Sequence, residues 1–168
     1  IRPFNFFSNQ PMHIYANELT QVAIKRDFYY AFEEKKDVGL PEMILHTIGM
    51  QPFSIGDIPF TPIQVMHREM PVLGFRIGDF TYITDANFIA DEEMDKLADL
   101  DVLVLNALRK YHHPSHFTLD ESLEVIKRLK PKKAYLIHLS HHMGKHELVE
   151  IELPENVFLA YDGLQVNF

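Results

Sequence analysis

Residues 134–144 read AYLIHLSHHMG and combine a short apolar run, typical of a β-strand, with a cluster of histidines. His138 ends that run. Two upstream runs end in the same way, because His67 follows PFTPIQVM and Asp85 follows FTYIT. The pattern predicts three strand ends that carry three potential ligands to one edge of a sheet. Imidazole and carboxylate groups suit Zn²⁺, Mn²⁺ or Fe²⁺, and a bridging carboxylate can hold two such ions.

A single histidine at a strand end is more often a surface or hydrogen-bonded residue than a metal ligand. The combination of three candidates favours a metal site over that alternative. A further cluster, YHHPSH at 111–116, lies between an apolar run and a predicted helix. His116 sits just before that helix, whose free N–H groups and positive dipole end favour a phosphate. For His112 and His113 a solvated loop is the favoured interpretation.

The composition indicates one globular unit. The chain has 168 residues, 46% of them hydrophobic with 13 Phe and 7 Tyr, which can supply a sizeable core. We therefore expect a single domain over 1–168. No apolar run approaches the roughly 18 residues of a membrane span, and no signal peptide is visible, so we expect a soluble, cytoplasmic protein without a membrane partner.

Two further counts restrict the chemistry. The absence of cysteine excludes disulfides and thiolate metal sites. The net charge of −8 disfavours binding along a nucleic-acid backbone. A small anionic substrate remains compatible with that charge if a metal supplies the positive field.

Periodicity and turn residues predict mixed β-structure first and alternating helices and strands afterwards. Asn17 and the Thr118/Glu121 pair are predicted helix caps, the second a capping box. The stretch EEKKD at 33–37 is predicted as a loop or helix end. The expected strands cover 12–16, 43–48, 53–55, 58–66, 72–77, 80–84, 102–105 and 134–139, the expected helices 18–32, 91–98 and 118–129, and the expected closing hairpin 157–160 with 164–168.

Five motifs in order carry a family resemblance: TDAN at 84–87, LNALR at 105–109, HPSHFTLDE at 113–121, HLSHHMG at 138–144 and AYDGL at 160–164. Together they resemble the C-terminal two-thirds of metallo-β-lactamase-fold hydrolases. The chain is most similar to the phosphoribosyl cyclic phosphodiesterase branch and more distantly similar to ribonuclease Z. This resemblance implies an α/β (α+β) fold, an αββα sandwich with two mixed sheets inside and helices outside, here N-terminally truncated.

The resemblance also implies roles for individual residues. His67 matches a ligand of the first metal, Asp85 the bridging ligand, which also takes part in catalysis, and His138 a ligand of the second metal. His116 matches the catalytic histidine that contacts phosphate and protonates the leaving group. Three more residues are expected beside the ligands or the substrate: His113, His141 and Asn106. Asn106 stands where many relatives have Asp, which puts its supporting role in doubt.

One family motif, His-x-His-x-Asp-His, has no match in this sequence. In relatives it precedes the segment that residues 1–7 resemble, so we interpret the sequence as an N-terminally truncated piece. We expect two divalent ions, Zn or Mn, in the intact protein and few or none here, with little activity. We also expect the piece to associate with its missing N-terminal segment or to form a homo-oligomer, because sheet surface would be exposed.

The intact protein is expected to be a phosphodiesterase that acts on a small phosphodiester, cyclic or open, through a dinuclear metal centre. Two alternatives stay open. One is a hydrolase of the same fold that cleaves another ester, a thioester or an RNA 3′ end. The other is a non-catalytic module with structural histidines.

Overall fold

The computed structural model describes residues 1–33 and 39–168. Most of the charged stretch predicted as a loop, residues 34–37, lies outside the described residues. The chain forms two compact units, Ile1–Gln51 and Pro52–Phe168, which are described separately. The expectation of a single domain over 1–168 stays a prediction.

The first unit packs a helix beside a small parallel sheet. Strands β1 (Met12–Ala16) and β2 (Met43–Thr47) pair in parallel, and α2 (Glu18–Asp27) follows β1. Asn17 caps α2, because its side chain accepts a hydrogen bond from the Thr20 N–H at 2.9 Å. The predicted helix over 18–32 is shorter than expected and gives way to a 3₁₀ turn. The remaining elements of this unit are α1 (Arg2–Ser8) and η1 (Tyr29–Ala31).

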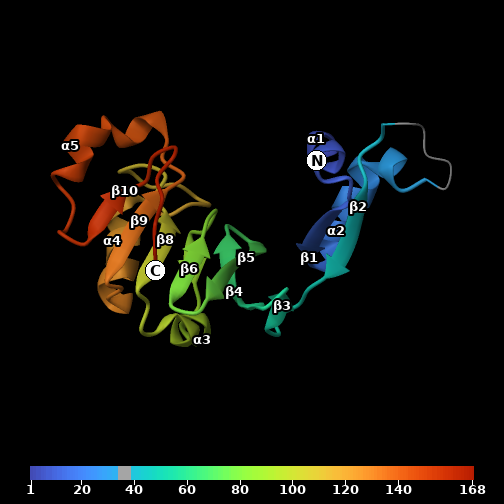
Figure 1. The fold of residues 1–168 in the computed structure, drawn as a ribbon. Helices are drawn as coiled ribbons and strands as arrows, with labels where there is room; N and C mark the ends of the chain where they lie inside the picture. The colour runs from blue at the N-terminus through green and yellow to red at the C-terminus, as the bar shows by residue number, and fades with distance from the viewer. Residues whose placement is uncertain (34–38) are drawn as a thin grey trace. The chain divides into compact units, whose positions relative to one another are not determined.

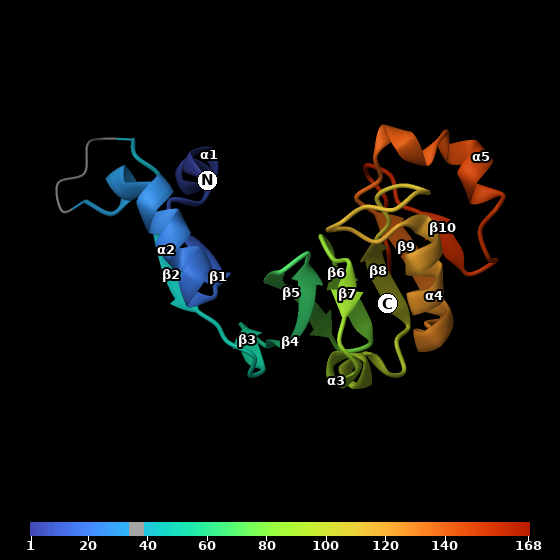
Figure 2. The same ribbon diagram turned by 180° about the vertical axis from the view of Figure 1, so that it is seen from behind.

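The second unit is built on a sheet of eight strands among the described residues, in the order β10-β9-β8-β6-β5-β4-β3 with β7 paired to β4 (Figures 1 and 2). Its strands are β3 (Phe53–Ile55), β4 (Ile58–His67), β5 (Met70–Ile77), β6 (Phe80–Ile83), β7 (Phe88–Ile89), β8 (Val102–Asn106), β9 (Lys133–Ile137) and β10 (Val157–Leu159). Its helices are α3 (Asp91–Met94), η2 (Asp95–Leu97), α4 (Leu119–Leu129), η3 (His141–Met143) and α5 (His146–Glu150).

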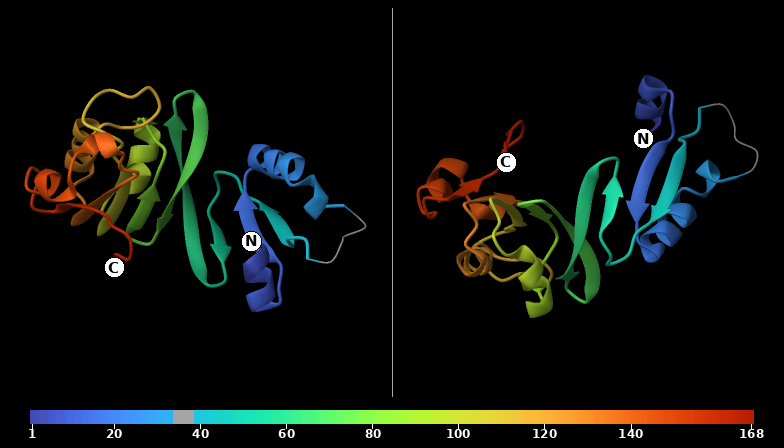
Figure 3. Two further views of the ribbon diagram at one scale, coloured as in Figure 1. Left: turned by 90° about the horizontal axis from the view of Figure 1, so that it is seen from above. Right: turned by 60° about the horizontal axis from the view of Figure 1, so that its bottom comes forward.

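The strand pairing in this sheet changes from antiparallel to parallel along the chain. Strands β3 to β6 pair antiparallel, and β4 and β5 form the long hairpin drawn in green in Figure 3. From β6 onward the pairs β6–β8, β8–β9 and β9–β10 are parallel. Parallel neighbours end at the same edge of the sheet, so the residues that follow β6 and β9 are brought together. This is the predicted order of mixed β-structure followed by alternating helices and strands.

The core lies around β8, whose five residues are all buried, as expected for a strand covered on both faces. Gly74 in β5 allows a close approach to β6. A Cβ at this position would lie 2.7 Å from the Ile83 side chain and 2.9 Å from the Tyr82 carbonyl oxygen. The largest fully buried side chains include Ile63, Ile83, Leu97, Leu100, Leu103, Leu105 and Leu136.

Helix α4 begins where the sequence predicts it, and the capping box is confirmed. The Thr118 hydroxyl accepts from the Glu121 N–H at 3.2 Å, and the Glu121 carboxylate accepts from the Thr118 N–H at 2.7 Å. The helix buries Leu119 and Ile126 in the same core cluster as the strands.

In the second unit, further details differ from the sequence predictions. The helix expected over 91–98 is a single α-turn, α3, followed by the 3₁₀ turn η2. The short elements β7 and α5 were not predicted, because two to five residues are too few to show a period. The closing hairpin is wrong: residues 164–168 form no strand, and Phe168 stacks instead on Phe80 with ring centroids 4.5 Å apart. No helix in the described part of the chain is long and apolar enough to cross a membrane.

Candidate metal centre at the strand ends

Three strands of the second unit deliver candidate ligands. His67 is the last residue of β4, Asp85 follows β6 by two residues, and His138 directly follows β9. Asp85 and His138 have φ angles of 55° and 58°, in the left-handed region that Asp and His enter more readily than most residues. The chain therefore turns sharply at both positions, just beyond the strand ends.

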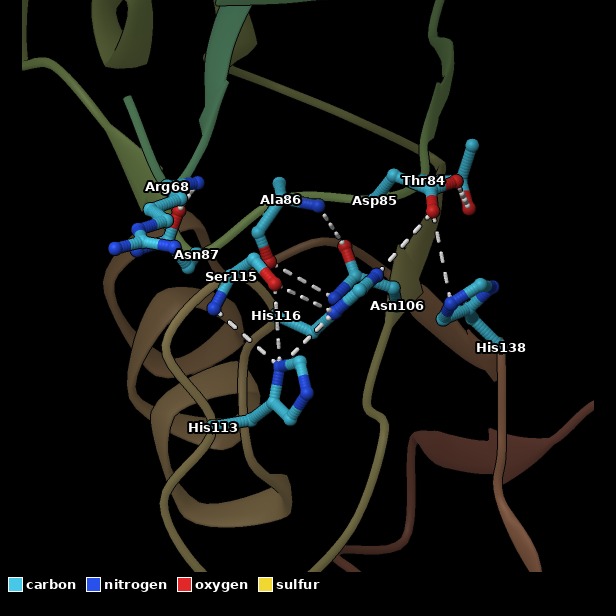
Figure 4. A network of polar contacts seen from close by, with 10 residues as sticks. All are labelled: Arg68, Thr84, Asp85, Ala86, Asn87, Asn106, His113, Ser115, His116 and His138. Atoms are coloured by element: carbon cyan, nitrogen blue, oxygen red, sulfur yellow. Dashed lines mark hydrogen bonds and ion pairs between the residues drawn. The ribbon is translucent and has the colours of Figure 1, made fainter. Parts of the chain in front are cut away.

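Asp85 lies between two imidazoles (Figure 4). Its Oδ1 lies 3.3 Å from His116 Nε2 and 3.6 Å from His138 Nε2. The His116 ring is 4.7 Å, centroid to centroid, from both His67, which it meets edge-on, and His138, on which it stacks. The fold thus brings together the four residues to which the sequence assigned metal binding or catalysis.

The residues present fit a divalent metal ion. One ligand atom from each of His67, Asp85 and His116 lies within 4.8 Å of the other two, and all three residues are half-buried. Two imidazoles and a carboxylate form a donor set that suits Zn²⁺ and its neighbours. This group contains His116, the predicted proton donor, whereas the prediction gave the third ligand position to His138. The individual roles stay predictions.

Hydrogen bonds keep the Asp85 carboxylate ionised. Burial opposes ionisation, but hydrogen bonds from Thr84 and His116 and the nearby imidazoles together lower the pKa of Asp85. The Thr84 hydroxyl donates to Asp85 Oδ2 at 2.9 Å. Thr84 stands in the TDAN motif but receives no role from the sequence, although its position directly before Asp85 was a signal for one.

Burial favours the neutral form of the two loop imidazoles. It is the main cause of the lowered pKa of His116, with His138 and His67 adding to it and the hydrogen bond to Asp85 opposing it. Burial also lowers the pKa of His113, helped by His116 and Arg109. A neutral imidazole can bind a metal through its unprotonated nitrogen.

His113 contacts His116 directly. Their Nδ1 atoms are 3.1 Å apart, and the Ser115 hydroxyl lies 3.4 Å from each of them. The loop between β8 and α4 is thus ordered around His116 by its own side chains, and His113 is part of the cluster. The interpretation of His113 as a solvated loop residue does not describe its position.

Asn106 and His141 are placed differently. Asn106 is fully buried at the end of β8, and its amide contacts both backbone groups of Ala86, the neighbour of Asp85. His141 is exposed in η3 and packs on His142 with ring centroids 3.8 Å apart, outside the group of potential ligands. Asn106 therefore contacts the residue that directly follows Asp85. His141 is not connected to the site in this way.

The comparison with known families agrees with this architecture. Residues 1–139 match the family model described as "Beta-lactamase superfamily domain". The chain belongs to this superfamily, and it has the metallo-β-lactamase fold.

Two solved structures have the same fold. A solved structure, "Crystal Structure of a New Diphosphatase from the PhnP Family", is 34% identical with a TM-score of 0.85 and is matched over 95% of this chain and 59% of that one. The metallo-β-lactamase fold protein YhfI from Bacillus subtilis, 18% identical, shares the fold with a TM-score of 0.73 over 97% of this chain and 68% of that one.

A curated relative from Porphyromonas gingivalis (strain ATCC BAA-308 / W83), named "Octanoyltransferase", is 33% identical over 160 residues. These residues make up 94% of this chain and 32% of that protein. The chain thus spans about a third of this relative and 59% of the diphosphatase.

Proposed function

We propose that the chain forms part of a metal-dependent hydrolase that cleaves phosphodiester bonds. The observation that carries this proposal is the convergence of His67, Asp85 and His116 at one edge of the sheet. The 34% identity to a diphosphatase of the PhnP family favours a phosphate ester or anhydride over other substrates. A small phosphodiester is the proposed substrate.

The proposed cofactor is a pair of divalent ions, Zn or Mn, in the intact protein. His67, Asp85 and either His116 or His138 would hold metal on this chain, with Asp85 shared between the ions. Bound divalent ions polarise phosphoryl oxygens and lower the pKa of a bound water. The group present here offers three close ligand atoms, so this chain alone is expected to hold a single ion at most, and weakly.

The tautomer of His116 decides between its two possible roles. In the neutral His113–His116 pair, one Nδ1 donates a hydrogen bond and the other accepts it across 3.1 Å. If His116 donates, its Nε2 carries the lone pair and can bind metal. If His116 accepts, its Nε2 carries the proton and can donate it to a phosphate or leaving-group oxygen. We propose that during turnover His116 accepts at Nδ1 and carries its proton on Nε2.

The test uses the longest natural polypeptide that contains these 168 residues, loaded with Zn²⁺ or Mn²⁺. Hydrolysis of bis(p-nitrophenyl) phosphate is compared with that of p-nitrophenyl acetate and an acyl thioester. We expect turnover of the phosphodiester and its loss in His116→Ala, with exposed His141→Ala as the matched control. Faster turnover of the ester or thioester would overturn the phosphodiesterase proposal in favour of the same-fold alternative, and no turnover of any probe would favour a non-catalytic module.

We also propose that the first unit is an association surface, in contact with a further segment of the protein or with a second copy. Large apolar side chains stay exposed there, among them Phe4, Phe6, Phe7, Leu19 and Val22. Exposed apolar patches of this kind mark interaction sites.

A further inference from the structure

Asn87 lies two residues after Asp85 and beside Arg68 (Figure 4). It contacts both neighbouring segments that carry site histidines. Its Oδ1 accepts a hydrogen bond from the Arg68 backbone N–H at 2.7 Å. Its Nδ2 donates to the Pro114 carbonyl at 3.3 Å. Its own backbone N–H donates to the Met66 carbonyl at 2.8 Å.

The first contact fixes the turn that follows His67. Arg68 has a φ of 60°, a left-handed conformation that costs a non-glycine residue free energy. The Arg68 N–H donates to Asn87 Oδ1, so this N–H has a partner in that conformation. Since His67 directly precedes Arg68, the position of the turn sets the position of the His67 imidazole.

The second contact fixes the loop between β8 and α4, which carries His113 and His116. Pro114 lies between His113 and His116, whose rings contact each other, and the His116 ring also contacts that of His67. This loop is also held at its end, where the Phe117 N–H donates to the Ala86 carbonyl at 2.7 Å. Asn87 adds a second anchor at the middle of the loop, three residues earlier in the chain.

We propose that Asn87 is a positioning residue that couples the two segments and thereby sets the spacing between the His67 and His116 imidazoles. The proposal rests on the proposed metal-dependent function. The side-chain amide serves both contacts, because its oxygen accepts from Arg68 while its nitrogen donates to Pro114. An aspartate would keep the first hydrogen bond and lose the second, and an alanine would lose both.

These two variants distinguish the Arg68 contact from the Pro114 contact, and the measurement is made on the metal-free protein. Amide hydrogen exchange and imidazole NMR signals are recorded for wild type, Asn87→Asp and Asn87→Ala. We expect exchange of the Arg68 amide to rise about fivefold in Asn87→Ala and to change little in Asn87→Asp. The His113 and His116 imidazole signals should shift in both variants.

Asn156→Asp is the matched control. The Nδ2 of Asn156 also donates to a proline carbonyl, that of Pro131, at 3.1 Å. Asn156 directly precedes β10, which pairs in parallel with β9, so it lies at the opposite edge of the sheet from His138. Its substitution should leave the His113 and His116 signals unchanged. Loop signals that respond equally to Asn156→Asp, or not at all to Asn87→Asp, would overturn the proposal.

The second readout is Co²⁺ titration of the longest natural polypeptide that contains these 168 residues, followed by visible absorption of the bound ion. We expect the apparent Kd to rise about tenfold in Asn87→Ala, as for partners that orient ligands, with an altered spectrum and no change in Asn156→Asp. If wild type binds no Co²⁺, the proposed function fails, while the metal-free NMR arm still decides whether Asn87 couples the two segments. If wild type binds Co²⁺ and Asn87→Ala binds it identically, the positioning proposal alone fails.

Discussion

Asn106 holds the backbone of Ala86 with both ends of its side-chain amide. Its Oδ1 accepts from the Ala86 N–H at 2.8 Å, and its Nδ2 donates to the Ala86 carbonyl at 2.9 Å. Both residues are fully buried, and Ala86 directly follows Asp85, whose backbone is left-handed. The paired contact therefore fixes the backbone directly after Asp85, beyond the end of β6.

Replacing Asn106 with Asp tests this clamp. The carboxylate keeps an acceptor but cannot donate to the Ala86 carbonyl, and it places a charge in a buried position. We expect a loss of about 1–3 kcal/mol in the free energy of unfolding, measured by urea denaturation, together with weaker Co²⁺ binding. Ser122→Ala is the control, because buried Ser122 donates to the Asn106 carbonyl at 2.7 Å without contacting Ala86. It should reduce stability and leave Co²⁺ binding intact. Unchanged metal binding in Asn106→Asp would show that the clamp does not support Asp85.

Single alanine substitutions test the ligand assignment. We expect His67→Ala, Asp85→Ala and His138→Ala to lower metal content, since each removes a predicted ligand, and His116→Ala to keep metal and lose turnover. Elemental analysis of the Zn²⁺-loaded protein measures the first effect. Full metal retention in His138→Ala, with loss in His116→Ala, would assign the ligand role to His116, as the observed grouping of His67, Asp85 and His116 favours.

Acidification should destabilise the fold. Burial lowers the pKa values of His113 and His116 below their ordinary value, so below about pH 6.5 the unfolded chain takes up protons that the folded chain does not. Stability should therefore fall from about pH 6.5 down to the folded pKa values of these imidazoles. The lowered pKa of Asp85 acts in the same direction at lower pH, because its contribution is lost as the pH falls through its folded pKa.

Urea denaturation of the metal-free protein at several pH values measures this slope. His116→Gln should flatten it below about pH 6.5, because the glutamine takes up no proton in either state. An equal slope in wild type and His116→Gln would contradict the assignment to His116.

Association through the first unit should depend on its exposed apolar residues. Leu19 on α2 is 76% exposed, and a glutamate there would oppose burial in an interface. We expect Leu19→Glu to shift the protein toward smaller species in size-exclusion chromatography with light scattering. Thr20→Glu adds the same charge at the next exposed position and should have a weaker effect. Identical elution of both variants and wild type would argue against this surface.

Most of the regular structure of the second unit could be predicted from local signals. The Gly56-Asp57 and Gly78-Asp79 turns predict the two hairpins, and the Thr118/Glu121 pair predicts the start of α4; all three are confirmed. Predictions were wrong where tertiary contacts outweighed a local pattern. Residues 164–168, LQVNF, alternate apolar and polar side chains as a strand does, yet Phe168 stacks on Phe80 and the segment forms no strand beside β10.

The candidate site was predictable only as a set of residues. Strand-end positions singled out His67, Asp85 and His138, and the helix that follows His116 singled out that residue. Asn87 and Thr84 stand in the TDAN motif at 84–87 but receive no role from the sequence, because a short polar residue beside a strand end is common in any loop. Only the contacts that these two residues make in the folded chain indicate a role for them.

The sequence by itself determined most of the longer elements, the order of hairpins followed by alternating helices and strands, and the chemical nature of the ligands, since these follow from short-range periodicity, capping and residue type. The tertiary structure alone decided which imidazoles share the Asp85 carboxylate. It also placed Asn106 against Ala86 and linked Asn87 to the Arg68 turn and the Pro114 loop. These contacts join residues about 20 to 30 positions apart, and their geometry depends on how parallel strands align at one edge of the sheet.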